Sequence, residues 1–176
     1  MNKHLKKLVL AALFLSLAMV LPFLTGQIKQ LGNAILPMHI PVLLCGFLCG
    51  PIYGVVVGFI SPLLRFLMFG MPPIFPEGVS MAFELLTYGF LSGILYRKFP
   101  KTNKYIYISL LCAMIGGRFV WGIVRYVLSQ CFGIDFSFAL FASGTLLSAI
   151  PGIVLQIIII PAIVMLLKKA GVEKDV

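Results

Sequence analysis

The segment MHIPVLLCGFLCGPIYGVVVGFISPLLRFLMF, from Met38 to Phe69, decides the fold. It is apolar almost throughout, and Arg65 is its single lysine or arginine. A helix rises about 1.5 Å per residue, and about 20 residues cross the hydrocarbon core of a bilayer. The segment is therefore too long for one crossing. Proline lacks an amide donor and opens a turn, so Gly50-Pro51 predicts a break between a short helix at 38–49 and a longer one at 53–69.

The rest of the chain has the same apolar character. Of its 176 residues, 61% are hydrophobic and 11% are charged, whereas a soluble domain is about 45–50% apolar and about 25% charged. This composition excludes a water-soluble enzyme, a disordered tail and a nucleic-acid-binding domain. The length holds roughly six membrane crossings. We predict an all-α membrane protein, a single domain over residues 1–176, with transmembrane helices at about 5–24, 38–49, 53–69, 77–96, 105–130 and 143–167.

The basic residues predict the orientation of these helices. The formal net charge is +9, and lysine and arginine accumulate in cytoplasmic loops. With the N-terminus inside, ten of the fourteen basic residues fall on the cytoplasmic side. They are Lys3, Lys6, Lys7, Arg97, Lys98, Lys101, Lys104, Lys168, Lys169 and Lys174. Both termini are therefore predicted to be cytoplasmic, and the positive charge requires no nucleic-acid partner.

Three arginines and one glutamate fall inside predicted helices. An arginine at the centre of a spanning helix costs about 2.5–3.5 kcal/mol on insertion scales, so such residues usually face a polar cavity or a partner. The predicted helix directions place all four residues in the outer half of the bundle. These residues are Arg65, Glu84, Arg118 and Arg125.

Their spacing predicts two polar helix faces. Arg118, Trp121 and Arg125 share one face at i, i+3 and i+7, and Glu84 and Tyr88 share another at i and i+4. Guanidinium groups bind carboxylates and phosphates in a planar fork. Three arginines against one glutamate leave a positive surplus, which favours an anionic ligand that enters from outside. The alternative is a structural network of glutamate and arginine, with the remaining arginine extending to the membrane interface.

Three further polar residues are candidate ligand contacts. His39 opens the second helix, Asn33 lies in the first outer loop, and Gln156 lies near the middle of the last helix. Each has an alternative role: an interfacial histidine, an exposed loop side chain, and a hydrogen bond between helices.

Small residues recur every four positions in two segments, a spacing that lets helices approach closely. The pattern serves either packing within the chain or docking of another membrane subunit. The residues are Ala12 and Ser16 in the first helix and Gly46, Gly50, Gly54 and Gly58 in the second and third.

Several motifs of enzymes are missing from the sequence. It contains no G-x-x-x-x-G-K-[ST] phosphate loop, so the chain does not use ATP by that route. It has no H-E-x-x-H, no G-x-S-x-G and no C-x-x-C pair. We expect no catalytic residue, no metal and no cofactor. An intramembrane enzyme that used Glu84 would need a second catalytic group, which the sequence does not offer.

Seven stretches resemble the S components, the substrate-binding subunits, of energy-coupling factor (ECF) vitamin transporters, and most closely the pantothenate-type subfamily. The similarity covers most of the chain in order and length. The stretches are MHIPVLL (38–44), GPIYG (50–54), PLLR (62–65), GMPP (70–73), MAFEL (81–85), YG (88–89) and GILY (93–96).

The resemblance implies a multi-pass protein of a prokaryotic cell membrane that binds a vitamin near the outer face. Its fourth to sixth helices would form the pocket, and its first three would face a transmembrane T component, with two cytoplasmic ATPases supplying energy. The family's first helix carries two alanines four residues apart. Here that spacing is occupied by Ala12 and Ser16, or by Ala11 and Leu15, so the match is imperfect and the docking register stays open.

The carboxylate of pantothenate suits an arginine. We expect Arg118 or Arg125 to contact it, Trp121 to shield the dimethyl portion, and Glu84 to accept hydroxyl or amide donors. Substrates of the pyridoxine, hydroxymethylpyrimidine or queuosine-precursor type are the alternatives within the family. A structural membrane-complex subunit without a ligand is the alternative outside it.

Overall fold

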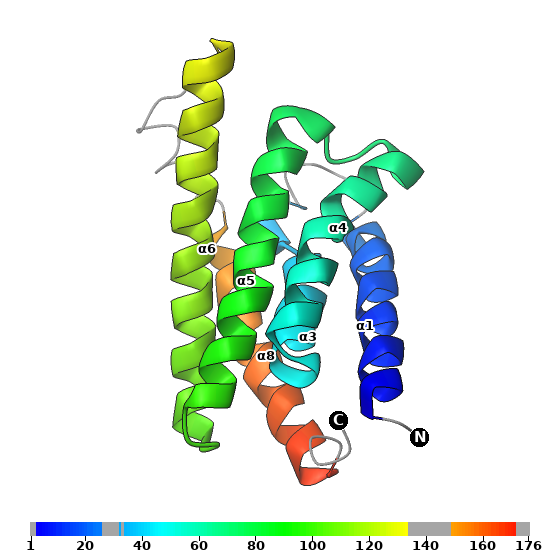
Figure 1. The fold of residues 1–176 in the computed structure, drawn as a ribbon, viewed down its shortest axis with the longest axis vertical. Coiled ribbons are helices and arrows are strands. Elements are labelled where there is room, and N and C mark those ends of the chain that lie inside the picture. The colour runs from blue at the N-terminus through cyan, green and yellow to red at the C-terminus, as the bar shows by residue number, and fades with distance from the viewer. Residues whose placement is uncertain (1–2, 26–31, 33, 134–148, 172–176) are drawn as a thin grey trace.

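The computed structural model describes residues 3–25, 32, 34–133 and 149–171, which form a bundle of helices (Figure 1). The elements are α1 (Lys3–Val20), η1 (Leu21–Thr25), α3 (His39–Cys49), α4 (Pro51–Phe69), η2 (Ile74–Gly78), α5 (Val79–Lys98), α6 (Asn103–Phe132) and α8 (Ile150–Lys169). Within these ranges there is no β-strand, so the predicted all-α class is confirmed. The predicted start of the last helix, at 143, lies outside the described residues.

Five helical stretches in the described part of the chain are long and apolar enough to cross a membrane. They are Lys3–Leu24, Pro51–Phe69, Ile74–Lys98, Asn103–Phe132 and Ile150–Lys169. The helix α3 has 11 residues, which is about 16 Å at 1.5 Å per residue and shorter than a hydrocarbon core of about 30 Å. A helix of sufficient length therefore supports five of the six predicted crossings.

The break between α3 and α4 lies at Gly50-Pro51, as the sequence predicts. Gly50 has a φ of +101°, a conformation that glycine adopts without a steric penalty. Pro51 follows as the first residue of α4, where its missing amide proton removes no hydrogen bond. The Arg97 guanidinium donates a hydrogen bond of 3.0 Å to the carbonyl oxygen of Cys49, which satisfies an end carbonyl of α3.

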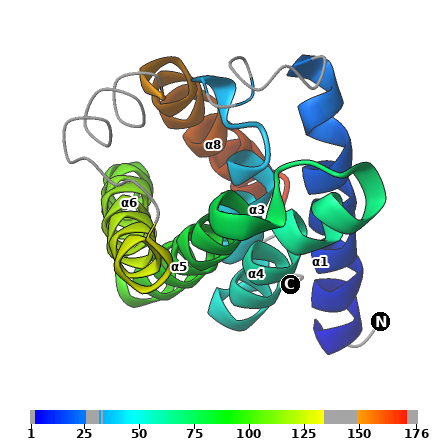
Figure 2. The same ribbon diagram turned by 90° about the horizontal axis from the view of Figure 1, so that it is seen from above.

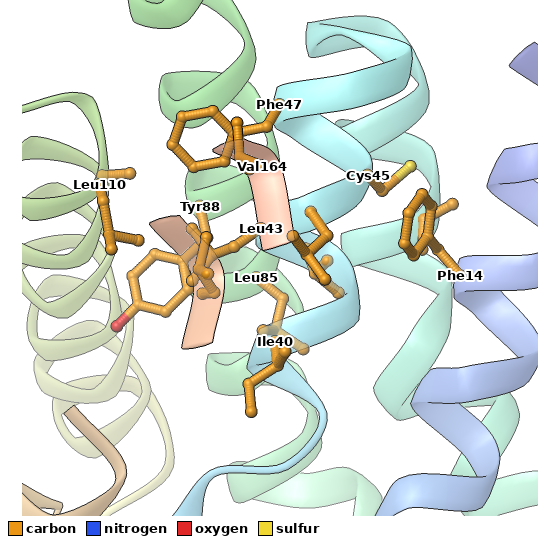
Figure 3. Close-up of a cluster of buried hydrophobic side chains, with 14 of the residues drawn as sticks. Phe14, Ile40, Leu43, Cys45, Phe47, Leu85, Tyr88, Leu110 and Val164 are labelled. Carbon is orange, nitrogen blue, oxygen red and sulfur yellow. The ribbon is translucent and has the colours of Figure 1, made fainter. Parts of the chain in front are cut away.

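The helix α3 forms the centre of the bundle, with α1 on one side and α6 on the other (Figure 2). Its sequence has no polar face, and every residue except Leu48 is buried. Apolar side chains from α1, α5, α6 and α8 close around it (Figure 3). Leu43 and Phe47 of α3 belong to the same cluster as Leu85, Leu110 and Val164. A short apolar helix thus supplies the core that holds the longer helices in place.

Glycines bring α3 and α4 against the backbone of α5. A Cβ atom added at Gly46 or at Gly54 would lie 2.6 Å from the carbonyl oxygen of Gly89, and one added at Gly58 would meet the Leu85 backbone. Such contacts need the absence of a side chain. Because Gly46, Gly54 and Gly58 are buried against α5, and Gly50 against the Arg97 guanidinium, these four glycines leave no surface for another subunit. The docking prediction is thereby restricted to Ala12 and Ser16, which are exposed on α1.

We expect Gly54→Ala to lower the free energy of unfolding by about 1–3 kcal/mol, because the added methyl group forces two helix backbones apart. Denaturant unfolding in detergent micelles measures this loss. Gly116→Ala is the matched control, since the atom nearest to its added methyl group is the end of the flexible Leu91 side chain. Equal stability of the two variants would contradict close backbone packing at Gly54.

Basic residues gather at one end of the bundle. The start of α1, the turn between α5 and α6, and the end of α8 lie together at the lower end of Figure 1. The Lys168 ammonium group donates a hydrogen bond to the carbonyl oxygen of Lys101, which joins two of these segments. This arrangement fits the predicted cytoplasmic side, and the orientation in the membrane stays a prediction.

Candidate binding site

Four polar side chains from three helices meet around Glu84. The carboxylate lies on α5 and is 1% exposed. The Tyr88 hydroxyl, one turn further along α5, donates to Glu84 Oε1 at 3.0 Å. The Arg118 Nη1 atom of α6 lies 3.1 Å from the same oxygen, and the His39 Nε2 atom of α3 lies 3.7 Å from Oε2. Glu84 is therefore the centre of the polar cluster, which we define as His39, Glu84, Tyr88 and Arg118.

Neighbouring residues fix the position of Tyr88. Its ring contacts the His39 ring edge-to-face, with centroids 5.4 Å apart. On its other side it lies against the backbone of Gly117, where a Cβ atom would collide with the ring. Figure 3 shows the side chain extending from α5 toward α6. Gly117 thus makes room for the ring, and the ring in turn places its hydroxyl group on Glu84.

A cavity of about 280 Å³ lies beside the polar cluster, between α5, α6 and α8. Tyr88 and Arg118 are among the residues that line it, but the surface that faces the cavity is almost entirely apolar. The other lining side chains are apolar: Leu111, Met114, Ile115, Phe119 and Ile153. This volume is at the small end for ligand pockets, which are about 300–1,000 Å³. The cavity suits a small and mainly apolar molecule.

Several buried polar atoms near the cavity have no hydrogen-bond partner among the described residues. They include Nε and Nη2 of Arg118, both ring nitrogens of His39, and both amide atoms of Gln156. Gln156 is fully buried on α8, one turn beyond Ile153 of the cavity wall. A buried polar group without a partner costs about 1–3 kcal/mol, and such groups are uncommon in native proteins. These atoms are ready to bind a ligand or ordered water.

Trp121 and Arg125 form a second contact nearer the end of α6. Arg125 Nη2 lies 3.2 Å from Glu77 Oε1 of η2, and its guanidinium lies 5.9 Å from the centre of the Trp121 ring. Phe75 of η2 also contacts Phe132 of α6, with ring centroids 4.9 Å apart. Neither Trp121 nor Arg125 is among the residues that line the cavity. The polar face predicted for α6 therefore makes two separate contacts, one to Glu84 through Arg118 and one to Glu77 through Arg125. The pairing with Glu77 was not predicted from the sequence.

Arg65 does not join the polar cluster, and its predicted convergence with Glu84 is wrong. Its guanidinium donates a hydrogen bond of 2.5 Å to the carbonyl oxygen of Met19. It lies 5.2 Å from the ring centres of both Phe23 and Phe69. Arg65 therefore fastens the end of α1 to α4, because a carbonyl oxygen and two aromatic rings satisfy the cation there. The predicted site residue Asn33 lies outside the described residues.

One comparison with known proteins gives a match. A family model described as "ECF transporter, substrate-specific component" matches residues 6–164, which is most of the chain. No curated protein and no solved structure matches this chain.

Proposed function

Because this chain belongs to the family of substrate-specific components of ECF transporters, we propose that it captures a small molecule in the cavity between α5, α6 and α8. The family comprises transporter subunits rather than enzymes, and membership implies a T component and ATPases as partners. The predicted resemblance to ECF substrate-specific components agrees with this family, and the pantothenate type stays a proposal. The exposed pair Ala12 and Ser16 on α1 is the proposed contact to the T component.

The observation that carries this proposal is that the Arg118 guanidinium is only partly paired. One nitrogen of its guanidinium pairs with Glu84, while Nε and Nη2 of this cavity-lining residue are buried without a partner in the described chain. A guanidinium held at one nitrogen presents its remaining donors in a fixed direction, which is how arginine recognises oxygen acceptors of a ligand. Arg118 thus supplies orientation, and the apolar wall supplies burial.

We further propose that the cavity opens toward the outside of a prokaryotic cell membrane. The basic residues at the ends of α1, α5 and α8 support this orientation, since they gather at one end of the bundle. Arg118 lies in the second half of α6, away from that end. A substrate then enters from the side opposite the ATPases.

The resemblance of the sequence favours pantothenate as the substrate, with pyridoxine, a hydroxymethylpyrimidine or a queuosine precursor as alternatives. His39, Gln156 and Asn33 remain proposed contacts for the polar groups of any of these molecules. Trp121 and Arg125, which lie outside the cavity wall, are proposed contacts at its outer end.

Ligand-induced thermal stabilisation of the purified protein in detergent, across a vitamin panel, tests this function. A ligand at about 100 times its dissociation constant adds about 2.7 kcal/mol to the free energy of unfolding. We expect one compound of the panel to raise the melting temperature in a concentration-dependent way. A protein that no compound stabilises would instead be a structural subunit of a membrane complex, with the polar cluster serving only to join helices.

A further inference from the structure

The pairing of the intramembrane charges bears on the charge of the substrate. Arg118 pairs with Glu84 at 3.1 Å, and Arg125 pairs with Glu77 at 3.2 Å. Arg65 lies at the contact of α1 with α4, where the Met19 carbonyl oxygen and two aromatic rings hold it. The positive surplus that the sequence predicts at the site is therefore missing from the described part of the chain.

The cavity wall itself carries one formal charge, that of Arg118, and Glu84 compensates it directly. With histidine uncharged, the polar cluster is electrically neutral. A carboxylate that entered this cavity would lose its hydration and give the cluster a net negative charge. Burying a charge without an opposite partner is costly, whereas a hydroxyl or amide oxygen accepts the same hydrogen bonds at a much lower cost of desolvation.

We propose that the substrate is uncharged: a small molecule with an apolar body whose hydroxyl, carbonyl or ring-nitrogen acceptor binds Nε and Nη2 of Arg118. This inference rests on the proposed function and selects the charge class of the substrate. It favours the pyridoxine and hydroxymethylpyrimidine types over pantothenate. The Gln156 amide and the His39 ring, which are also buried without a hydrogen-bond partner in the described chain, stay further proposed contacts although they do not line the cavity.

Matched pairs of compounds that differ in one carboxylate test the proposal. Pantothenate is compared with pantothenol, its alcohol analogue, and nicotinate with nicotinamide, and pyridoxine is added as an uncharged ring. Binding is measured by thermal shift and by calorimetry at one fixed pH for all compounds. We expect an uncharged compound to bind, and the acid of any pair that binds to be weaker than its neutral partner by about tenfold or more.

Glu84→Gln supplies an independent readout. The amide keeps the shape of the side chain and accepts the Tyr88 hydrogen bond, but it leaves Arg118 without a compensating charge. We expect this variant to shift the ratio of acid to neutral affinity toward the acid by about tenfold or more. Arg97→Gln, which removes a charge at the opposite end of the bundle, is the control and should leave the ratio unchanged. The melting temperature of each variant without ligand verifies that it is folded.

The outcomes separate this inference from the proposed function. Tighter binding of the acids by the wild-type protein would overturn the inference and leave the role as a binding subunit intact. An unchanged ratio in a folded Glu84→Gln protein would also overturn it. If neither the acids nor the neutral compounds bind, the inference and the proposed function fall together.

Discussion

Arg118→Lys is expected to weaken substrate binding by about 10- to 100-fold while the protein stays folded. Hydrogen bonds to a charged group contribute about 1.5–3 kcal/mol each, and 1.4 kcal/mol is a factor of ten in affinity. Lysine keeps the positive charge opposite Glu84, but it replaces the planar fork by a single ammonium group. The Nε and Nη2 donors at the cavity are then lost.

The measurement is the dissociation constant of the compound that stabilises the wild-type protein. Arg97→Lys is the matched control, because this arginine donates to the Cys49 carbonyl oxygen at the opposite end of the bundle. Its affinity for the compound should equal that of the wild-type protein. Wild-type affinity in a folded Arg118→Lys protein would show that Arg118 serves only as the partner of Glu84.

Glu84→Ala is expected to lower the free energy of unfolding by about 3–5 kcal/mol, because it leaves the Arg118 cation without its partner inside the protein. The same change removes the acceptor of the Tyr88 hydroxyl and the carboxylate that faces His39. Denaturant unfolding in mixed micelles measures the loss. If Glu84→Ala yields too little folded protein for this measurement, its yield is compared with that of the wild-type protein. The free energy of unfolding of Glu84→Gln is then measured in its place.

Glu77→Ala provides the comparison for this stability effect. Its carboxylate also pairs with an arginine of α6, but it is 34% exposed, and exposed ion pairs contribute about 0–1 kcal/mol. The two variants therefore remove the same kind of ion pair at different depths. Equal losses would mean that burial does not set the energy of the Glu84 pair.

Much of the fold could be predicted from the sequence, because apolar length and turn residues report directly on helices in a membrane. The uninterrupted apolar run after Met38 and the Gly50-Pro51 break were enough to place α3 and α4. The role of the glycines could not be predicted from the sequence alone. Spacing shows that Gly46, Gly54 and Gly58 share a face, but only the structure shows that α5 covers it.

The members of the site could be predicted in part. Glu84 and Tyr88 come together because helical spacing places them on one face of α5, where Arg118 of α6 meets them. The partners of the arginines could not be predicted, since pairing depends on how helices cross. Arg65 lies on an apolar helix like Arg118, yet it reaches a backbone carbonyl oxygen of α1 instead of a carboxylate. A count of charges in the sequence therefore does not determine the net charge of the polar cluster.

The glycine contacts described above also bear on how the cavity changes shape. Helices whose backbones touch resist sliding past one another, so we expect α3, α4 and α5 to move together. Among the described residues, α8 contributes Ile153 to the cavity wall, and its Gly152 meets the backbone of residues 34 and 35 equally closely. We therefore expect α5 to hold Glu84 and Tyr88 in place when a ligand enters, so that the ligand meets donors and acceptors that are already oriented.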